Sequence, residues 1–309
     1  MPVGERQTFP LVPRRRRLVG LPFGDLPSRR RGLGGETIGA RPYLPGDPVS
    51  TIDWFATARL SAAKGRDDFV VRDRSADEAP RVTVLADRRP AMGIFPSSLP
   101  WLEKPRAFVE AATAIVASAT AARSDIASLD LAGGAGPYWL PPGRRDRMWL
   151  VPERLGEATP FDAPEDNLER AFGFLGGLRS DLPPGTFVFV LSDFLVSPPA
   201  VAWVEALAHG WDLVPVVIQD PVWEQSFPPV GGVTVPIADP RSGRVALVRL
   251  SRRQAARRRE ENELRHRRLL AELASLGLEP VVVRTSEPQA IDRAFIAWAE
   301  LRRQSRWAR

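Results

Sequence analysis

Cysteine is absent from this chain of 309 residues, and histidine occurs only at His209 and His266. Without cysteine, neither a disulfide framework nor a thiolate metal site can form, and the composition is compatible with a reducing compartment. Two histidines leave little material for a zinc site or for histidine acid–base catalysis. These shortages count against several common classes of enzyme and metalloprotein.

Long apolar runs are also missing. No segment approaches the roughly 18 residues that a membrane-spanning helix needs, and the N-terminus lacks the continuous apolar core of a signal peptide. We therefore expect a cytoplasmic protein with no transmembrane segment, for which peripheral contact with a membrane stays open.

Motifs of the common enzyme classes are missing as well. The chain has no G-x-x-x-x-G-K-[ST] phosphate loop and no G-x-S-x-G nucleophile elbow. The segment GLGGETIG (residues 32–39) lacks the spacing and the flanking strand and helix of a dinucleotide-binding loop. We therefore predict a protein that is not an enzyme and that binds no cofactor.

Positive charge is concentrated at the N-terminus. The formal net charge is +6, and residues 1–35 hold eight arginines against two acidic residues. Such a segment, interspersed with proline and glycine, is typical of a flexible arm that either contacts an acidic lipid, nucleic acid or protein or is merely solvated. We expect a flexible basic arm over residues 1–35 and a short tail over residues 304–309.

Apolar segments alternate with amphipathic ones from residue 81 onward. Strands are predicted at residues 81–87, 125–133, 186–194, 211–220 and 278–285, with an edge strand at 244–250. Helices are predicted between them, at residues 106–123, 165–179, 199–209 and 252–276 and near the C-terminus. This alternation predicts an α/β fold, a doubly wound and mostly parallel sheet with helices on both faces. We expect this domain over residues 81–303, preceded by a small subdomain over residues 36–80.

The expected subdomain contains the most informative segment, GARPYLPGDPVSTIDWFATAR (residues 39–59). It follows the pattern G-x-R-x-Y-x-x-G-D, four residues, then I-D-W-x-x-x-A-R. The matching residues are Gly39, Arg41, Tyr43, Gly46, Asp47, Ile52, Asp53, Trp54, Ala58 and Arg59. The segment resembles the signature of the bacterial domain-of-unknown-function family fifty-eight, although Ser50 stands where that family usually has arginine.

The signature allows a structural and a functional interpretation. In the structural one, Asp47 accepts backbone hydrogen bonds in a turn and Trp54 anchors the subdomain against the main sheet. In the functional one, Arg41, Asp53 and Arg59 form an exposed ion-pair surface that recognises a partner. All five residues are therefore candidate partner-binding residues.

Two acidic residues follow predicted strands at the edge where open parallel sheets bind ligands, Asp87 after RVTVL and Asp193 in LSDF. This arrangement resembles a von Willebrand factor A domain, in which an Asp-x-Ser-x-Ser loop, a later threonine and a later aspartate hold a divalent cation. Arg89 and Ala91 occupy the serine positions, and Thr159 is the candidate threonine. Because two hydroxyl ligands are lost and a guanidinium is added, we expect a degenerate metal-ion-dependent adhesion site that holds no metal.

Two roles for Arg89 stay open. Its planar guanidinium can pair with Asp87 or Asp193 as a resident cation in place of a metal. Alternatively, Arg88 and Arg89 point outward to a carboxylate or phosphate of a partner. These residues complete the candidate partner-binding set.

A later run, QDPVWEQSFPPVGG (residues 219–232), is similar to a D-P-x-E segment of the same family, with one extra residue before Glu224. Its proline and glycine content predicts an ordered loop.

The family resemblance implies a non-enzymatic adaptor or assembly factor. It further implies a MoxR-type AAA+ ATPase as partner, with the pair acting in the maturation or remodelling of an unknown client protein. The alternative is a protein that binds nucleic acid or an anionic membrane surface through the basic arm, for which nucleic acid is the less favoured ligand because no aromatic residues interleave the arginines of residues 252–268.

Overall fold

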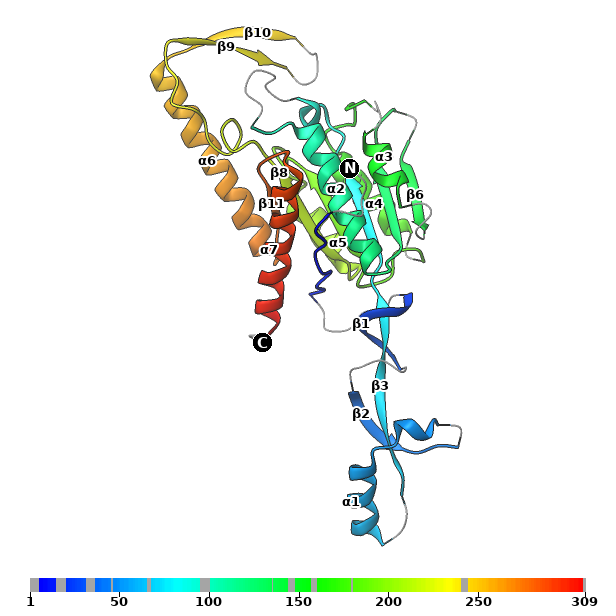
Figure 1. Ribbon diagram of the computed structural model, residues 1–309. Helices are drawn as coiled ribbons and strands as arrows, with labels where there is room; N and C mark the ends of the chain where they lie inside the picture. Colours follow the sequence, from blue (N-terminus) through cyan, green and yellow to red (C-terminus); the bar gives the residue numbers. More distant parts are fainter. Residues whose placement is uncertain are drawn as a thin grey trace.

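A six-stranded sheet in the order β11-β8-β7-β4-β5-β6 lies at the centre of the molecule (Figure 1). The computed structural model describes residues 6–14, 21–31, 37–45, 47–65, 68–94, 101–134, 136–143, 148–156, 160–178, 180–239 and 244–307. The strands of the central sheet are β4 (Val82–Ala86), β5 (Ile126–Asp130), β6 (Tyr138–Gly143), β7 (Phe187–Ser192), β8 (Asp212–Ile218) and β11 (Val281–Val283). Its neighbouring strands are parallel, except that β6 runs antiparallel to β5.

The predicted fold class is confirmed. The predicted strands at residues 81–87 and 186–194 are direct neighbours, with Val82 opposite Phe187 and Ala86 opposite Leu191. Every residue of β4, β5, β7 and β8 is buried. That is the reason these strands are almost uniformly apolar, because helices cover both faces of the sheet.

The helices divide between the two faces of the central sheet. The core on one face contains side chains of α2 (Lys104–Ala121), α3 (Leu150–Gly156) and α7 (Pro288–Trp307). The core on the other face contains side chains of α4 (Asn167–Gly177), α5 (Ala200–Ala208) and α6 (Arg252–Ser275). In α2, Phe108, Ala111, Ala112, Ile115 and Ala119 recur at helical spacing and are fully buried, as the sequence pattern predicts.

Residues 6–14 pack against the sheet domain. Phe9, Leu11 and Val12 belong to the same core as α2 and α7, and the ring of Phe9 stacks on that of Phe295 with 4.7 Å between centroids. The expectation of a flexible arm over residues 1–35 is therefore wrong for this part. Arginine and proline dominate the local composition, so the three apolar side chains that fill the core are inconspicuous in the sequence.

Arg6 fixes the start of this segment through ion pairs. Its guanidinium lies 2.8 Å from the carboxylate of Glu110 on α2 and 2.9 Å from that of Asp292 on α7. One of the arginines assigned to the basic arm is therefore neutralised inside the molecule.

A second unit projects from the sheet domain at the end of the long strand β3 (Val70–Ala79) (Figure 1). There β3 pairs antiparallel with β1 (Leu21–Arg31) and β2 (Thr37–Pro42). The short 3-10 helix η2 (Val49–Thr51) and α1 (Trp54–Lys64) complete this signature unit. Since β1 comes from the expected arm, the unit begins before residue 36.

In the part of the chain that the structure describes, β9 (Val233–Ala238) and β10 (Val245–Leu250) form a separate two-stranded sheet. The strand predicted at residues 244–250 therefore exists, but it is not an edge strand of the main sheet. A final 3-10 turn, η3 (Pro90–Gly93), follows β4. Within the described ranges, no helix combines the length and the apolar character that crossing a bilayer requires.

The packing of residues 6–14 predicts a stability effect. Phe9→Ala leaves a cavity between the sheet and α7, so we expect it to lower the free energy of unfolding by about 3–5 kcal/mol. Phe55→Ala is the matched control, because Phe55 is 82% exposed and its truncation should change stability by less than about 0.5 kcal/mol. Urea unfolding of both variants measures the difference, and equal stabilities would contradict the placement of Phe9.

Candidate functional site

Five charged side chains meet at the carboxyl ends of β4 and β7. Asp87 follows β4, Asp193 follows β7, and Arg89 lies in the loop between β4 and η3. Lys104 is the first residue of α2, and Glu224 lies in the loop after β8. The ends of parallel strands meet at one edge of the sheet, which explains why residues so far apart in sequence form one cluster.

Arg89 pairs with Asp87. Its Nε lies 3.0 and 2.9 Å from the two carboxylate oxygens, and its Nη2 lies 2.5 Å from Oδ2. The same Nη2 is 3.5 Å from Oδ1 of Asp193, and Nη1 donates to the carbonyl of Val196 at 2.8 Å. The guanidinium therefore lies between the two aspartates that the sequence singles out.

Lys104 forms the second half of the cluster. Its Nζ lies 3.0 Å from Oδ2 of Asp193, contacts the carboxylate of Glu224 and donates to the carbonyl of Ala91 at 3.1 Å. Only 4% of its side chain is exposed. Sequence reasoning missed Lys104, although one signal was available, because it is one of only two lysines in a chain with 41 arginines.

Neutral side chains complete the hydrogen bonding of the two aspartates. Asp87 accepts from the hydroxyl of Ser192 at 2.6 Å and from Nδ2 of Asn167 at 2.9 Å. The carboxylate of Asp193 accepts from the backbone N–H of Leu195 at 3.0 Å, and its backbone carbonyl accepts from the side chain of Gln219 at 2.6 Å. Satisfied lone pairs are what make buried carboxylates tolerable, so this network is a built feature of the fold.

The cluster perturbs the pKa values of its members. Burial lowers the pKa of Lys104, but the charges of Asp193 and Glu224 more than offset it, so that pKa lies above its usual value. Burial also raises the pKa of Glu224, which the neighbouring charge of Lys104 only partly opposes. With three carboxylates and two cations, the cluster has one acidic group more than it can neutralise, and Glu224 is the one pushed toward its protonated form.

A divalent cation does not fit this cluster. The position between Asp87 and Asp193 is filled by the guanidinium of Arg89, and Asp193 is also engaged by Lys104. Ala91 supplies no side-chain oxygen, and Thr159 lies outside the described residues. Among the side chains that the structure describes, no group of three histidine, aspartate or glutamate residues is arranged to hold a metal.

Arg88 and Arg89 do not point outward to a partner, and that alternative is wrong. Arg88 is fully buried, with its guanidinium 5.4 Å from the ring centre of Phe108 and 5.1 Å from that of Phe161. It donates to the carbonyl of Arg154 at 3.0 Å. The aromatic rings supply the apolar and cation–π contacts that make burial of this side chain favourable.

The signature unit contains a second set of ion pairs, at the molecular surface. Arg41 binds Asp47 through two nitrogens at 2.7 and 2.6 Å, and the backbone N–H of Leu44 donates to the same carboxylate at 2.8 Å. The hydrogen bond from Arg41 lowers the pKa of Asp47 to about 2. The predicted turn around Asp47 is therefore present, while Gly46 lies outside the described residues.

Asp53 begins α1. One of its carboxylate oxygens accepts from the backbone N–H of Ala56 at 3.1 Å, as an N-cap does, and the other lies 2.9 Å from Nε of Arg72 on β3. The pKa of Asp53 is lowered chiefly by Arg72. The predicted role of Asp53 in an exposed ion pair is real, but its partner is Arg72, and Arg59 lies exposed on α1.

Trp54 does not anchor the unit against the main sheet. Its side chain is 59% exposed, and its ring contacts that of Phe69, which in turn contacts Tyr43, within the signature unit. Phe55, Leu44 and Val49 are also exposed. We call these four apolar side chains, Leu44, Val49, Trp54 and Phe55, the signature surface.

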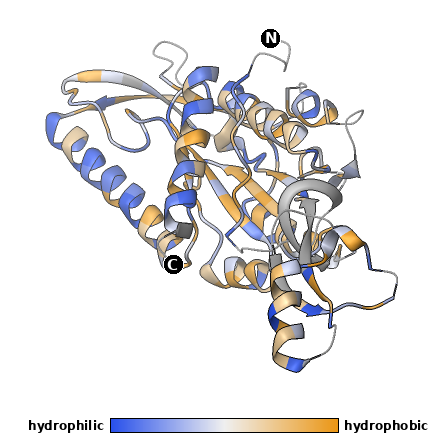
Figure 2. Cartoon of the chain, turned by 60° about the horizontal axis from the view of Figure 1, so that its bottom comes forward, coloured by the Kyte–Doolittle hydropathy of each residue, from blue (hydrophilic) through white to orange (hydrophobic). Residues whose placement is uncertain are grey.

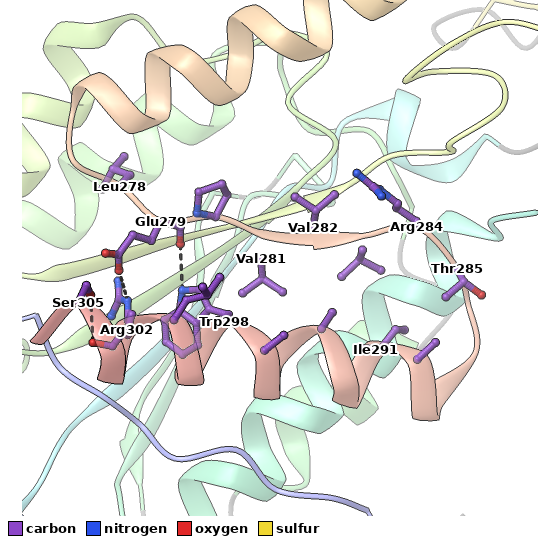
Figure 3. A pocket seen from close by; sticks show the side chains of 16 residues that line it. Leu278, Glu279, Val281, Val282, Arg284, Thr285, Ile291, Trp298, Arg302 and Ser305 are labelled. Carbon is purple, nitrogen blue, oxygen red and sulfur yellow. Dashed lines mark hydrogen bonds and ion pairs between the residues drawn. The ribbon is translucent and has the colours of Figure 1, made fainter. Parts of the chain in front are cut away.

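A groove of about 780 Å³ lies elsewhere, between β11 and α7 (Figure 3). Val281 and Val282 line one wall, and Ile291 and Trp298 line the other. Figure 3 shows one ion pair among the residues that line the groove, between Nε of Arg302 and Oε2 of Glu279 at 2.5 Å. The groove shares no residue with the five-charge cluster and lacks its chemistry.

The fold and the cluster define the chain as an α/β protein with a mostly parallel sheet and a buried cluster of charged side chains at the carboxyl ends of two central strands. The family described as "Protein of unknown function DUF58" matches residues 39–269, from the signature through most of α6. The chain belongs to this family. No curated protein matches the sequence.

Solved structures show weak likeness. One is an aerotolerance-related membrane protein from Bacteroides fragilis NCTC 9343 with multiple mutations to serines, at 16% identity and a TM-score of 0.40, covering 72% of this chain and 99% of that one. Another is the conserved hypothetical protein BatB from Bacteroides thetaiotaomicron, at 17% identity and a TM-score of 0.40, with the same coverage. The pilus adhesin SpaC from Lactobacillus rhamnosus GG has 11% identity and a TM-score of 0.35, covering 75% of this chain and 32% of that one. The fold class follows from the sheet topology and not from these likenesses.

The chain's two lysines provide a matched test of the cluster. Lys104→Met removes the cation nearest to Asp193 and the one paired with the partly buried Glu224, so we expect the free energy of unfolding to fall by about 3–5 kcal/mol. Lys64→Met removes an exposed i,i+4 pair with Asp68 and should cost less than about 1 kcal/mol. Denaturant unfolding compares the two, and a Lys104 variant as stable as the Lys64 variant would contradict the arrangement.

Glu224 predicts a pH dependence of stability. Its pKa is raised by folding above the reference value of 4.5, so its contribution is fully present below that pH and is lost as the pH rises through the raised pKa. Glu224→Gln removes this ionisation. The unfolding free energy of the wild type minus that of the variant should therefore decrease as the pH rises above 4.5. A difference that grows with pH would show that folding instead favours the ionised form.

Proposed function

We propose that this chain is a non-enzymatic adaptor that binds a MoxR-type AAA+ ATPase through the signature surface. The observation that carries the proposal is the exposure of Trp54 and Phe55, 59% and 82%, side by side at the start of a helix that projects from the main body. Large apolar side chains gathered on a surface mark a site of protein association. Aromatic residues are also the usual energetic centres of such interfaces.

Figure 2 shows how the signature unit differs from the sheet domain, because hydrophobic segments of the sheet lie inside the molecule whereas those of α1 lie at its periphery. Within α1 only Thr57 is buried. Trp54 and Ala58 lie one turn apart and are both exposed, even though the ring of Trp54 contacts that of Phe69 on one side. An isolated helix of 11 residues is marginal in water, and a docking partner would stabilise it.

Ion pairs flank the signature surface and suit it to specific recognition. Arg41 with Asp47, and Asp53 with Arg72, hold the turn and the start of α1 in place. Their positions limit the motion of the neighbouring apolar side chains, which lowers the entropy lost on binding. Arg59 adds a positive charge to the same helix.

The five-charge cluster has an internal role in this proposal. Asp87 and Asp193 are fully buried and Arg89 is 5% exposed, so a partner cannot contact them directly. We assign them to holding the ends of β4, β7 and α2 in register without a divalent cation. Candidate binding residues therefore reduce to those of the signature unit.

The alternative, binding through a basic arm at residues 1–35, gains no support from Arg6, whose charge is neutralised by Glu110 and Asp292. The absence of recognised catalytic motifs agrees with a role in binding. The client protein is not specified by any feature of the site.

Trp54→Ala combined with Phe55→Ala tests the proposal. Loss of a hot-spot aromatic costs about 2 kcal/mol or more, so loss of both, about 4 kcal/mol, should lower the affinity for the MoxR-type ATPase by roughly 700-fold. Isothermal titration calorimetry with a purified MoxR-type ATPase from the same organism measures the change. Circular dichroism of the variant checks that the fold is intact.

Trp101→Ala is the matched control, since Trp101 is 60% exposed but lies three residues before Lys104. Its affinity should equal that of the wild type. If Trp101→Ala abolishes binding while the double variant does not, the edge of the sheet near the cluster is the docking surface. If the wild type does not bind the ATPase, the proposed partner is wrong.

A further inference from the structure

A second projecting unit stands at the opposite end of the molecule from the signature unit (Figure 1). It consists of the β9–β10 hairpin and the larger, N-terminal part of α6, which follows β10 directly. We call the described part of it, residues 233–239 and 244–268, the hairpin unit. Figure 2 shows hydrophobic stretches in the hairpin next to the largely hydrophilic turns of α6.

The hairpin unit is strongly basic. Its described residues contain ten arginines against three glutamates and Asp239, an excess of six positive charges, which equals the net charge of +6 of the whole chain. Residues 1–35 are therefore not the only segment with an excess of positive charge. Acidic residues elsewhere in the chain balance the charge of the hairpin unit, so the net charge of the whole chain does not reveal it. Such a concentration attracts an anionic surface.

Several of these arginines have no acidic partner. Arg257 pairs with Glu261, and Arg259 donates to the carbonyl of Phe227. Within the described ranges, Arg252 and Arg253 form no ion pair, and both are exposed in the first turn of α6, where no acidic residue is present. The helix dipole disfavours cations at that end, so a bound anion would relieve a local electrostatic conflict.

One face of the hairpin is apolar and exposed. Side chains alternate along β10, which places Val245 and Leu247 on the same face as Arg249. Val245 and Leu247 are 63% and 74% exposed, and Pro236, opposite Leu247 on β9, is exposed as well. Two aliphatic side chains and a proline thus face solvent on a strand pair that carries an arginine.

The other face of β10 fixes the hairpin to α6. Val248 and Leu250 pack with Phe227 and Ala255 in a small separate core. The turn that precedes β9 also packs closely against the start of α6. A Cβ atom on Gly231 would lie only 2.2 Å from Cγ of Arg252. The hairpin is therefore fixed in position next to the first turn of α6, with its apolar face turned to solvent.

We propose that the hairpin unit binds an anionic lipid bilayer, with Val245 and Leu247 entering the interfacial region and Arg249, Arg252 and Arg253 contacting lipid phosphates. Aliphatic side chains gain free energy when they leave water for lipid, and arginine adds attraction to anionic headgroups. Nucleic acid fits the surface less well. Residues 233–268 contain no Phe, Tyr or Trp for stacking on bases, and a phosphate backbone offers no apolar environment for Leu247.

Co-sedimentation of the full chain with vesicles tests the proposal. The wild type should bind vesicles of phosphatidylcholine and phosphatidylglycerol mixed one to one, and should bind pure phosphatidylcholine vesicles much more weakly. Leu247→Asp should lower the partition coefficient for the mixed vesicles on the order of tenfold. Arg252→Glu combined with Arg253→Glu should lower it on the order of 30-fold, and added salt should weaken wild-type binding.

Leu301→Asp is the matched control, because Leu301 is 66% exposed on α7 and lies outside the hairpin unit. Its vesicle binding should match that of the wild type. Equal binding to both vesicle types, or binding that survives the Leu247 and the double arginine substitutions, would overturn the proposal. Binding to duplex DNA that is lost in the double arginine variant but not in Leu247→Asp, with no vesicle binding, would assign the surface to nucleic acid instead.

Discussion

The pairing of two buried cations with two buried aspartates and the partly buried Glu224 is the constraint on which the sheet domain depends. Asp87 and Asp193 end two adjacent central strands, and Arg89 and Lys104 connect them to the β4 loop and to the start of α2. Taking such charges out of water costs several kcal/mol per ion, so the arrangement is tolerable only with dense, well-aligned hydrogen bonding. The direct contacts of Ser192 and Asn167 with Asp87 meet that requirement.

Resident cations differ from a bound metal in one physical respect. A guanidinium and an ammonium joined to the chain cannot dissociate, so the charge balance of this edge does not depend on the concentration of a divalent ion. The planar fork of Arg89 matches the two oxygens of Asp87, and Lys104 spans the gap to Glu224. The edge at which open parallel sheets usually bind ligands is thereby occupied by the protein's own side chains.

Because that edge is filled, the exposed apolar groups of the molecule lie on its projections. The signature surface carries aromatic side chains between surface ion pairs, whereas the hairpin unit carries aliphatic side chains among arginines. Aromatic side chains suit a protein interface, and aliphatic side chains among cations suit an anionic lipid surface. The molecule therefore presents two surfaces of different chemistry at opposite ends (Figure 1).

The sequence alone determined the fold class, the strands that end at Asp87 and Asp193 and the turn around Asp47, because periodicity and turn chemistry are local properties. It could not place Trp54, since an aromatic residue looks the same in a sequence whether it packs on a sheet or on Phe69. It also could not bring Lys104 to Asp193, 89 residues away, or show that Phe9 fills the core beside Phe295. Those contacts depend on the order of the strands in the sheet and on which face of the sheet each helix covers. Both are set by how the side chains of the whole chain pack together in the core, which a local sequence pattern does not encode.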